Sequence, residues 1–165
     1  MSKVYTIKAV QKIPVDIDTA WQFFSSPHNL GAITPADISF TVTSKYSGNT
    51  MYPGQIIEYT LKPLPGMRFY WMTEITHVSD KNFFVDEQRF GPYSLWHHQH
   101  HFTIIEGGVE MTDIVHYKIP YWFIGNIANS LLVRKQLQKI FAFRFKVIQD
   151  KFGAWPEQGE EIIII

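Results

Sequence analysis

The chain has 165 residues, and its 15 basic and 15 acidic side chains cancel to a formal net charge of zero. This balance leaves no electrostatic footprint for nucleic acid or for an anionic membrane surface. The lack of cysteine excludes disulfides, thiol catalysis and a thiolate zinc site.

The N-terminal region predicts one strand followed by two short helices. Residues 3–13 alternate between apolar and polar side chains, as a half-buried strand does. The N-terminal residues 1–10 resemble neither a signal peptide nor a membrane span. We therefore expect a cytoplasmic protein without integral membrane association. Asp16 or Asp18 can cap a helix over 17–24, and Pro27 can start a second helix that ends at Ile33.

Six strands are expected next, bounded by turns rich in glycine and proline. Gly107-Gly108 is the strongest hairpin signal among these turns. The expected strands are 38–43, 55–62, 67–78, 83–90, 93–105 and 109–118.

A long helix is predicted over residues 122–152. Its apolar residues recur at spacings close to multiples of a helical turn, after Pro120 and before Gly153. Basic residues gather on the other side, where we expect a solvated surface or a docking surface for an acidic partner or lipid headgroup. This basic face comprises Arg134, Lys135, Lys139, Arg144 and Lys146.

The element order predicts an α+β fold, in which a curved antiparallel sheet of about seven strands folds around the long C-terminal helix. We expect one domain over residues 1–155 and a C-terminal tail over 156–165. The tail ends in four isoleucines, which would be sticky if exposed. They are expected to pack on the domain or to pair with the sheet edge of a second chain in a homodimer.

Several motifs carry a resemblance to a known superfamily. They are Trp21-Gln22-Phe23-Phe24, Phe84-Val85-Asp86-Glu87-Gln88, Gly91-Pro92-Tyr93 and Trp96-His97-His98-Gln99-His100-His101-Phe102. With the element order, they resemble the Bet v 1/START-like (SRPBCC) superfamily, and more narrowly its bacterial ligand-binding members, some labelled as cell-division inhibitors.

The resemblance implies a helix-grip fold with a deep cavity between the sheet and the C-terminal helix. Members of the superfamily bind lipids, sterols, polyketides or hormones, and a minority catalyse cyclisation or hydrolysis. The 16% aromatic content of this chain suits such a cavity, although it also suits a solid core.

Strand alternation predicts which polar side chains face the helix. In residues 93–105 the more apolar face carries His98 and His100, and pairing with residues 83–90 brings Asp86 and Gln88 close to them. Aromatic side chains would hold the apolar body of a ligand. The predicted ligand-binding residues are Trp21, Tyr59, Trp71, Asp86, Gln88, Trp96, His98, His100, Phe102, Asp113, Tyr117 and Phe141.

Four interpretations of this polar cluster stay open. It can be a satisfied network that holds the strands in register, or it can bind the polar end of a ligand. A His-Asp pair can also act as acid and base, but no nucleophile is evident, so we assign no catalytic residue. The histidines at 97, 98, 100 and 101 with Asp86 or Asp113 resemble a metal set, but a strand brings only alternate histidines together. We assign no metal and no cofactor.

The sequence thus predicts binding of a hydrophobic or aromatic small molecule, such as a lipid, sterol or polyketide, with no nucleic-acid partner. Tyr121-Trp122-Phe123-Ile124 can form an aromatic mouth to the cavity or a hydrophobic lead-in to the helix. One alternative is a cyclase, aromatase or hydrolase that uses the His-Asp pair. Another is an interaction module related to stress or cell division.

Overall fold

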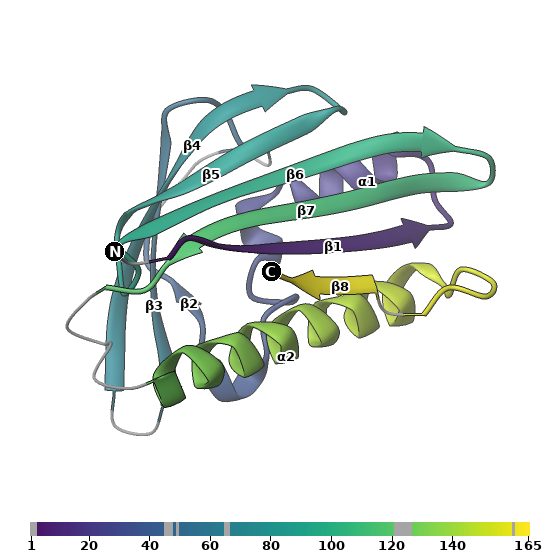
Figure 1. Cartoon of the computed structure of the whole chain (residues 1–165). Helices are drawn as coiled ribbons and strands as arrows, with labels where there is room; N and C mark the ends of the chain where they lie inside the picture. The colour runs from purple at the N-terminus through teal and green to yellow at the C-terminus, as the bar shows by residue number, and fades with distance from the viewer. Residues whose placement is uncertain (1–2, 45–47, 49, 65–66, 121–126, 160) are drawn as a thin grey trace.

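The computed structural model describes residues 3–44, 48, 50–64, 67–120, 127–159 and 161–165. Its largest feature is an eight-stranded antiparallel sheet with the order β2-β3-β4-β5-β6-β7-β1-β8 (Figure 1). The strands are β1 (Tyr5–Ile13), β2 (Thr41–Val42), β3 (Gln55–Leu64), β4 (Met67–Ser79), β5 (Phe83–Phe90), β6 (Leu95–Ile105), β7 (Gly108–Lys118) and β8 (Glu161–Ile164).

Two α-helices pack against the sheet. Helix α1 (Ile17–Phe24) is capped by Asp16, whose Oδ1 accepts a hydrogen bond of 2.7 Å from the backbone N–H of Thr19. Helix α2 (Ile127–Phe152) ends at Gly153, whose φ of 102° is the left-handed backbone that favours glycine after a helix. In Figure 1 the curved sheet wraps around α2, and α1 lies near the end of the β6–β7 hairpin.

The region between α1 and β3 is less regular than the sequence predicts. The helix expected over 27–33 is only a 3-10 turn, η1 (Pro27–Asn29), where the Asn29 side chain donates to the carbonyl of Phe23 at 2.9 Å. The strand expected over 38–43 begins as a second 3-10 turn, η2 (Ala36–Ile38). Ser39 then takes a left-handed φ of 48°, which no strand accommodates, so that only Thr41–Val42 pair with β3.

The C-terminal tail forms the eighth strand. Strand β8 pairs antiparallel with β1, in a register that sets Ile164 opposite Ile7. Ile164 is 6% exposed and Ile163 is 56% exposed, as alternation along an edge strand requires. The structure thus pairs the tail within its own chain, where residues 161–164 extend the sheet.

The apolar core has a large part on each side of the polar residues described below. One part lies under α1, where Trp21 and Phe24 pack on Phe84 and Phe102. The second lies between α2 and the β7–β1–β8 side of the sheet and includes Phe141.

Candidate ligand-binding site

A cavity of about 240 Å³ lies between strands β3 to β6 and helix α2. Most of its wall is apolar, and its apolar residues include Leu30, Ile33, Ile57, Phe69, Tyr93, Leu137 and Ile140. Leu132 also lines the cavity and is 54% exposed, so the cavity reaches the surface beside the first turns of α2. The aromatic mouth expected at 121–124 lies outside the described residues.

The structure brings seven of the twelve predicted site residues onto the cavity wall. They are Tyr59, Trp71, Asp86, Trp96, His98, His100 and Phe141. Phe141 lies on α2. Alternation along β3 to β6 turns the other six side chains toward α2, because residues two apart share one face of a strand. Trp71 and Trp96 meet edge to face, with ring centroids 5.4 Å apart.

Three predicted aromatic residues face inward but pack in the core. Trp21 and Phe102 meet edge to face beneath α1, with ring centroids 5.4 Å apart. Tyr117 stacks on Tyr5, with centroids 5.5 Å apart. These residues support the cavity from either side without lining it.

Gln88 has a structural contact of its own. Its side-chain amide donates to the carbonyl of Tyr93 at 2.6 Å and accepts from the N–H of Tyr93 at 3.2 Å. It thereby closes the connection between β5 and β6. A Cβ at Gly91 would lie 2.5 Å from Gln88 Oε1, which explains the glycine at this position.

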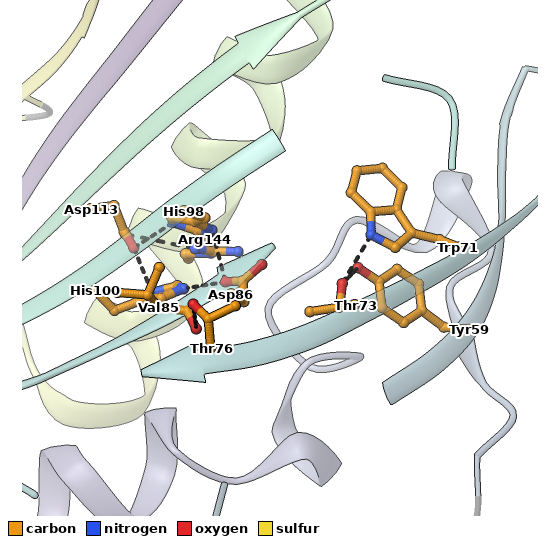
Figure 2. A network of polar contacts seen from close by, with 10 residues as sticks. All are labelled: Tyr59, Trp71, Thr73, Thr76, Val85, Asp86, His98, His100, Asp113 and Arg144. Carbon is orange, nitrogen blue, oxygen red and sulfur yellow. Dashed lines mark hydrogen bonds and ion pairs between the residues drawn. The ribbon is translucent and has the colours of Figure 1, made fainter. Parts of the chain in front are cut away.

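Asp86, His98, His100 and Asp113 form a buried charged cluster on three neighbouring strands. The strand register sets Asp86 opposite His98 and His100 opposite Asp113. His98 Nε2 and His100 Nδ1 lie 2.9 and 2.8 Å from Asp113 Oδ1. His100 Nε2 and His98 Nδ1 lie 2.9 and 3.4 Å from Asp86 Oδ2. Each imidazole therefore lies between two carboxylates, and Asp113 lies behind the cavity wall (Figure 2).

The surroundings of the cluster shift the pKa values of the two histidines in opposite directions. Burial lowers the pKa of His98, the neighbouring His100 lowers it further, and together they outweigh the attraction of the carboxylates. Burial also acts to lower the pKa of His100, but Asp113 and Asp86 outweigh it, and this pKa is raised. Of the two imidazoles, His100 therefore holds a proton more readily, and His98 is the first to become neutral as the pH rises.

Both carboxyl groups stay ionised in this site. Burial alone would raise the pKa of Asp86, but interactions with His98, His100 and Arg144 bring it below its ordinary value. The pKa of Asp113 is held well below its ordinary value. Burial acts to raise this pKa, and the interactions with His100, His98 and Arg144, of which His100 comes first, outweigh it.

Arg144 completes the cluster, although the sequence predicts it on the solvated basic face of α2. Its side chain is 14% exposed, lines the cavity and places Nη1 3.6 Å from Asp113 Oδ2. The guanidinium also lies over the ring of Phe141, 5.1 Å from its centroid. The sequence spacing does indicate this inward position. Arg144 lies three residues after Phe141 and four before Ile148, and both of these are buried on the inner face of the helix.

Neither a protein-family model nor a curated protein sequence matches this chain. Solved structures do. A protein of Mycobacterium smegmatis is 17% identical, with a TM-score of 0.64 over 88% of this chain and 89% of that chain. A Chromobacterium violaceum protein is 11% identical, with a TM-score of 0.67 over 91% and 99%. The major latex-like protein of Panax ginseng is 14% identical, with a TM-score of 0.62 over 90% and 97%.

The chain has the helix-grip fold. In this fold a curved antiparallel sheet closes around one long C-terminal helix, as the sequence predicts. At these low identities the likeness shows the fold alone. No helix among the described residues is long and apolar enough to cross a membrane.

A second polar group lies across the helix-grip cavity from the charged cluster. Thr73 Oγ1 lies 3.0 Å from the Tyr59 hydroxyl and 2.9 Å from Trp71 Nε1, which donates to it (Figure 2). Burial raises the pKa of Tyr59, so this group stays uncharged. Thr73 is absent from the predicted site, although it shares its strand face with Trp71.

Three residues of the charged cluster meet the distance requirement for a metal. Donor atoms of Asp86, His98 and His100 all lie within 4.8 Å of one another. However, His98 Nδ1 and His100 Nε2 already lie 3.4 and 2.9 Å from Asp86 Oδ2. The positive charge of the nearby Arg144 guanidinium also opposes the binding of a metal cation. His97 and His101 instead contact polar neighbours within the sheet, Glu87 and Gln99, at 3.0 Å each.

Proposed function

We propose that this protein binds a small hydrophobic or aromatic molecule in the cavity between its sheet and α2. The observation that carries the proposal is a cavity of about 240 Å³ whose wall is mostly apolar and aromatic. An apolar cavity of about 150 Å³ in another protein stays dry and binds benzene. Drug-sized sites begin at about 300 Å³, so an aromatic molecule of about two rings or a short aliphatic chain fits better than a sterol.

A substitution that fills the cavity tests the proposal. Val133 lines the cavity from α2, so Val133→Phe places a ring where the ligand would lie. Leu131→Phe adds a ring to the same helix at a side chain that is 53% exposed, and it serves as the matched control. Naphthol binding can be followed by fluorescence, because Trp71 and Trp96 form part of the wall.

We expect Val133→Phe to weaken naphthol binding at least tenfold and Leu131→Phe to leave it unchanged. Equal binding by both variants would place naphthol outside the cavity and contradict the proposal. Native mass spectrometry of protein from a lipid-rich lysate would then identify the natural ligand. A released mass of a few hundred daltons is the expected result.

A proton-transfer enzyme is the second candidate, favoured by one observation. His98 faces the cavity with a lowered pKa, so its neutral form can accept a proton near neutral pH. This is the chemistry that a cyclase, aromatase or hydrolase needs. His98→Gln would abolish turnover and spare binding in an enzyme, whereas in a carrier it would change only the affinity.

Finer assignments also remain proposals. Membership of the bacterial ligand-binding subfamily is supported by the inward Asp86 and His98 and by the connection that Gly91 allows. An interaction module related to stress or cell division would keep its partner in the filled-cavity variant Val133→Phe. A cytoplasmic location and a homodimer remain predictions from the sequence.

A further inference from the structure

Arg144 has hydrogen-bonding capacity that the protein leaves unused. Its Nε and Nη1 atoms are buried, and neither has a hydrogen-bond partner among the described residues. A guanidinium has only donors, so what it lacks is an acceptor. Leaving such donors buried and unpaired is costly, which suggests that the partner arrives from outside the chain.

Arg144 also lies where a ligand can reach it. The side chain is part of the cavity wall, as are Asp86, Tyr59 and Trp71. Figure 2 shows the guanidinium and the Asp86 carboxylate at the edge of the charged cluster that faces Tyr59, Trp71 and Thr73. An acceptor at the end of a bound molecule would therefore lie beside the Arg144 side chain, and a shift of that side chain would bring Nε or Nη1 to it.

The charges of the cluster indicate what kind of acceptor fits. When His100 is protonated and His98 is neutral, the two ionised carboxylates balance the guanidinium and His100. A neutral imidazole has one N–H, yet His98 Nε2 and Nδ1 lie 2.9 and 3.4 Å from carboxylate oxygens of Asp113 and Asp86. One of these contacts therefore sets a lone pair against a carboxylate. A second proton on His98 would satisfy both contacts and leave the cluster with one excess positive charge.

We propose that the cavity takes a small apolar acid, whose carboxylate pairs with Arg144 and supplies the acceptor that its guanidinium lacks. The inference rests on the proposed binding function and narrows it to a ligand class. Carboxylate and guanidinium form charge-assisted hydrogen bonds, which are the strong ones in a buried site. The hydrocarbon body of the acid would lie against Trp71, Trp96 and the apolar wall.

Binding of an acid should draw a proton onto His98. The titratable groups that act on this imidazole are Asp86 on β5, His100 on β6 and Asp113 on β7, and Arg144 on α2 lies beside Asp113. Of the three that act on it, His100 disfavours the added proton and the two carboxylates favour it. A ligand carboxylate adds a further negative charge, which favours the protonated form of His98. We therefore expect uptake of up to one proton per acid bound.

A pair of probes that differ only in charge tests the inference. Naphthoic acid and naphthamide have the same rings, and isothermal titration gives both affinities for the wild type, Arg144→Gln and Lys146→Gln. Lys146 is exposed on the same helix, so its variant removes the same charge away from the cavity. We expect the wild type and Lys146→Gln to prefer the acid by about 10- to 100-fold. Arg144→Gln should lose that preference and bind the amide within about threefold of the wild type.

Titration of the wild type in phosphate and in Tris measures proton uptake independently of any variant. Uptake with the acid and none with the amide supports the inference even if Arg144→Gln fails to fold. His98→Gln should remove the uptake. Equal affinity for both probes, or a preference for the amide, overturns the acid assignment and leaves the apolar cavity in place. If neither probe binds, both the inference and the proposed function fail.

Discussion

Replacing Asp113 with asparagine should destabilise the protein strongly, although the two side chains have nearly the same shape. The carboxylate of Asp113 lies 2.9 Å from His98 Nε2 and 2.8 Å from His100 Nδ1, and 3.6 Å separate it from Arg144 Nη1. Asparagine leaves the protonated His100 and the guanidinium with one carboxylate between them. Both cations are buried, so solvent cannot replace the lost charge.

The expected loss follows from that burial. Removing one partner of a buried ion pair costs about 3–5 kcal/mol, mostly because the remaining charge stays desolvated. A chain of this length loses about 2–4 °C in melting temperature per kcal/mol, so Asp113→Asn should melt about 6–20 °C lower. Urea unfolding measures the free energy, and calorimetry measures the midpoint. Asp37→Asn is the matched control, because Asp37 forms an exposed ion pair with Lys139 and should leave both unchanged.

The pH dependence of the stability difference between the wild type and Asp113→Asn provides a second check. The pKa of Asp113 is lowered in the folded state, so its stabilisation is present above its ordinary value of 3.8. It is lost only as the pH falls through the folded value. The gap between wild type and Asp113→Asn should therefore persist down to about pH 4. A loss below about 1 kcal/mol at neutral pH would show that the cluster is not held by charge, and would refute this reasoning.

Other predictions concern the tail and the two histidines. Ile164→Ala should cost about 2–5 kcal/mol in urea unfolding, because Ile164 is 6% exposed, while Ile163→Ala at 56% exposed should stay within about 0.5 kcal/mol. The raised pKa of His100 means that its stabilisation is complete below pH 6.5 and fades as the pH rises through the folded value. The lowered pKa of His98 acts in the opposite sense, with stability lost as the pH falls below 6.5. Unfolding free energies across pH should show His100→Gln without the alkaline decline and His98→Gln without the acid decline.

Much of the fold could be predicted because the strands are regular. Period-two alternation along β6 and β7 turns His98, His100 and Asp113 to the inner face, where the structure places them. Two irregular segments could not be predicted this way. The left-handed Ser39 depends on local backbone geometry, and the eighth strand depends on a long-range pairing between the tail and β1.

The site was harder to predict, because facing inward differs from facing a cavity. Trp21 and Phe102 point toward the interior but meet each other beneath α1, and no local pattern distinguishes them from Trp71 on the wall. Arg144 was missed for a different reason. Its charge suggests a surface position, and only its spacing from Phe141 and Ile148 places it inside. Its place in the site depends on the packing of α2 against the sheet, which brings Arg144 close to Asp113.

The position of β1 affects the order in which this chain can fold. Its two neighbours in the sheet come from residues 108–118 and 161–164, whereas β2 to β6 each pair with the strand next along the chain. A ribosome adds about 5–20 residues per second, so about 100 residues, or 5–20 s, separate the first strand from its first neighbour. Contacts between such distant segments form slowly, because a long loop must close first. The oldest strand of the nascent chain is therefore the last to be enclosed, and the isoleucine tail completes the sheet.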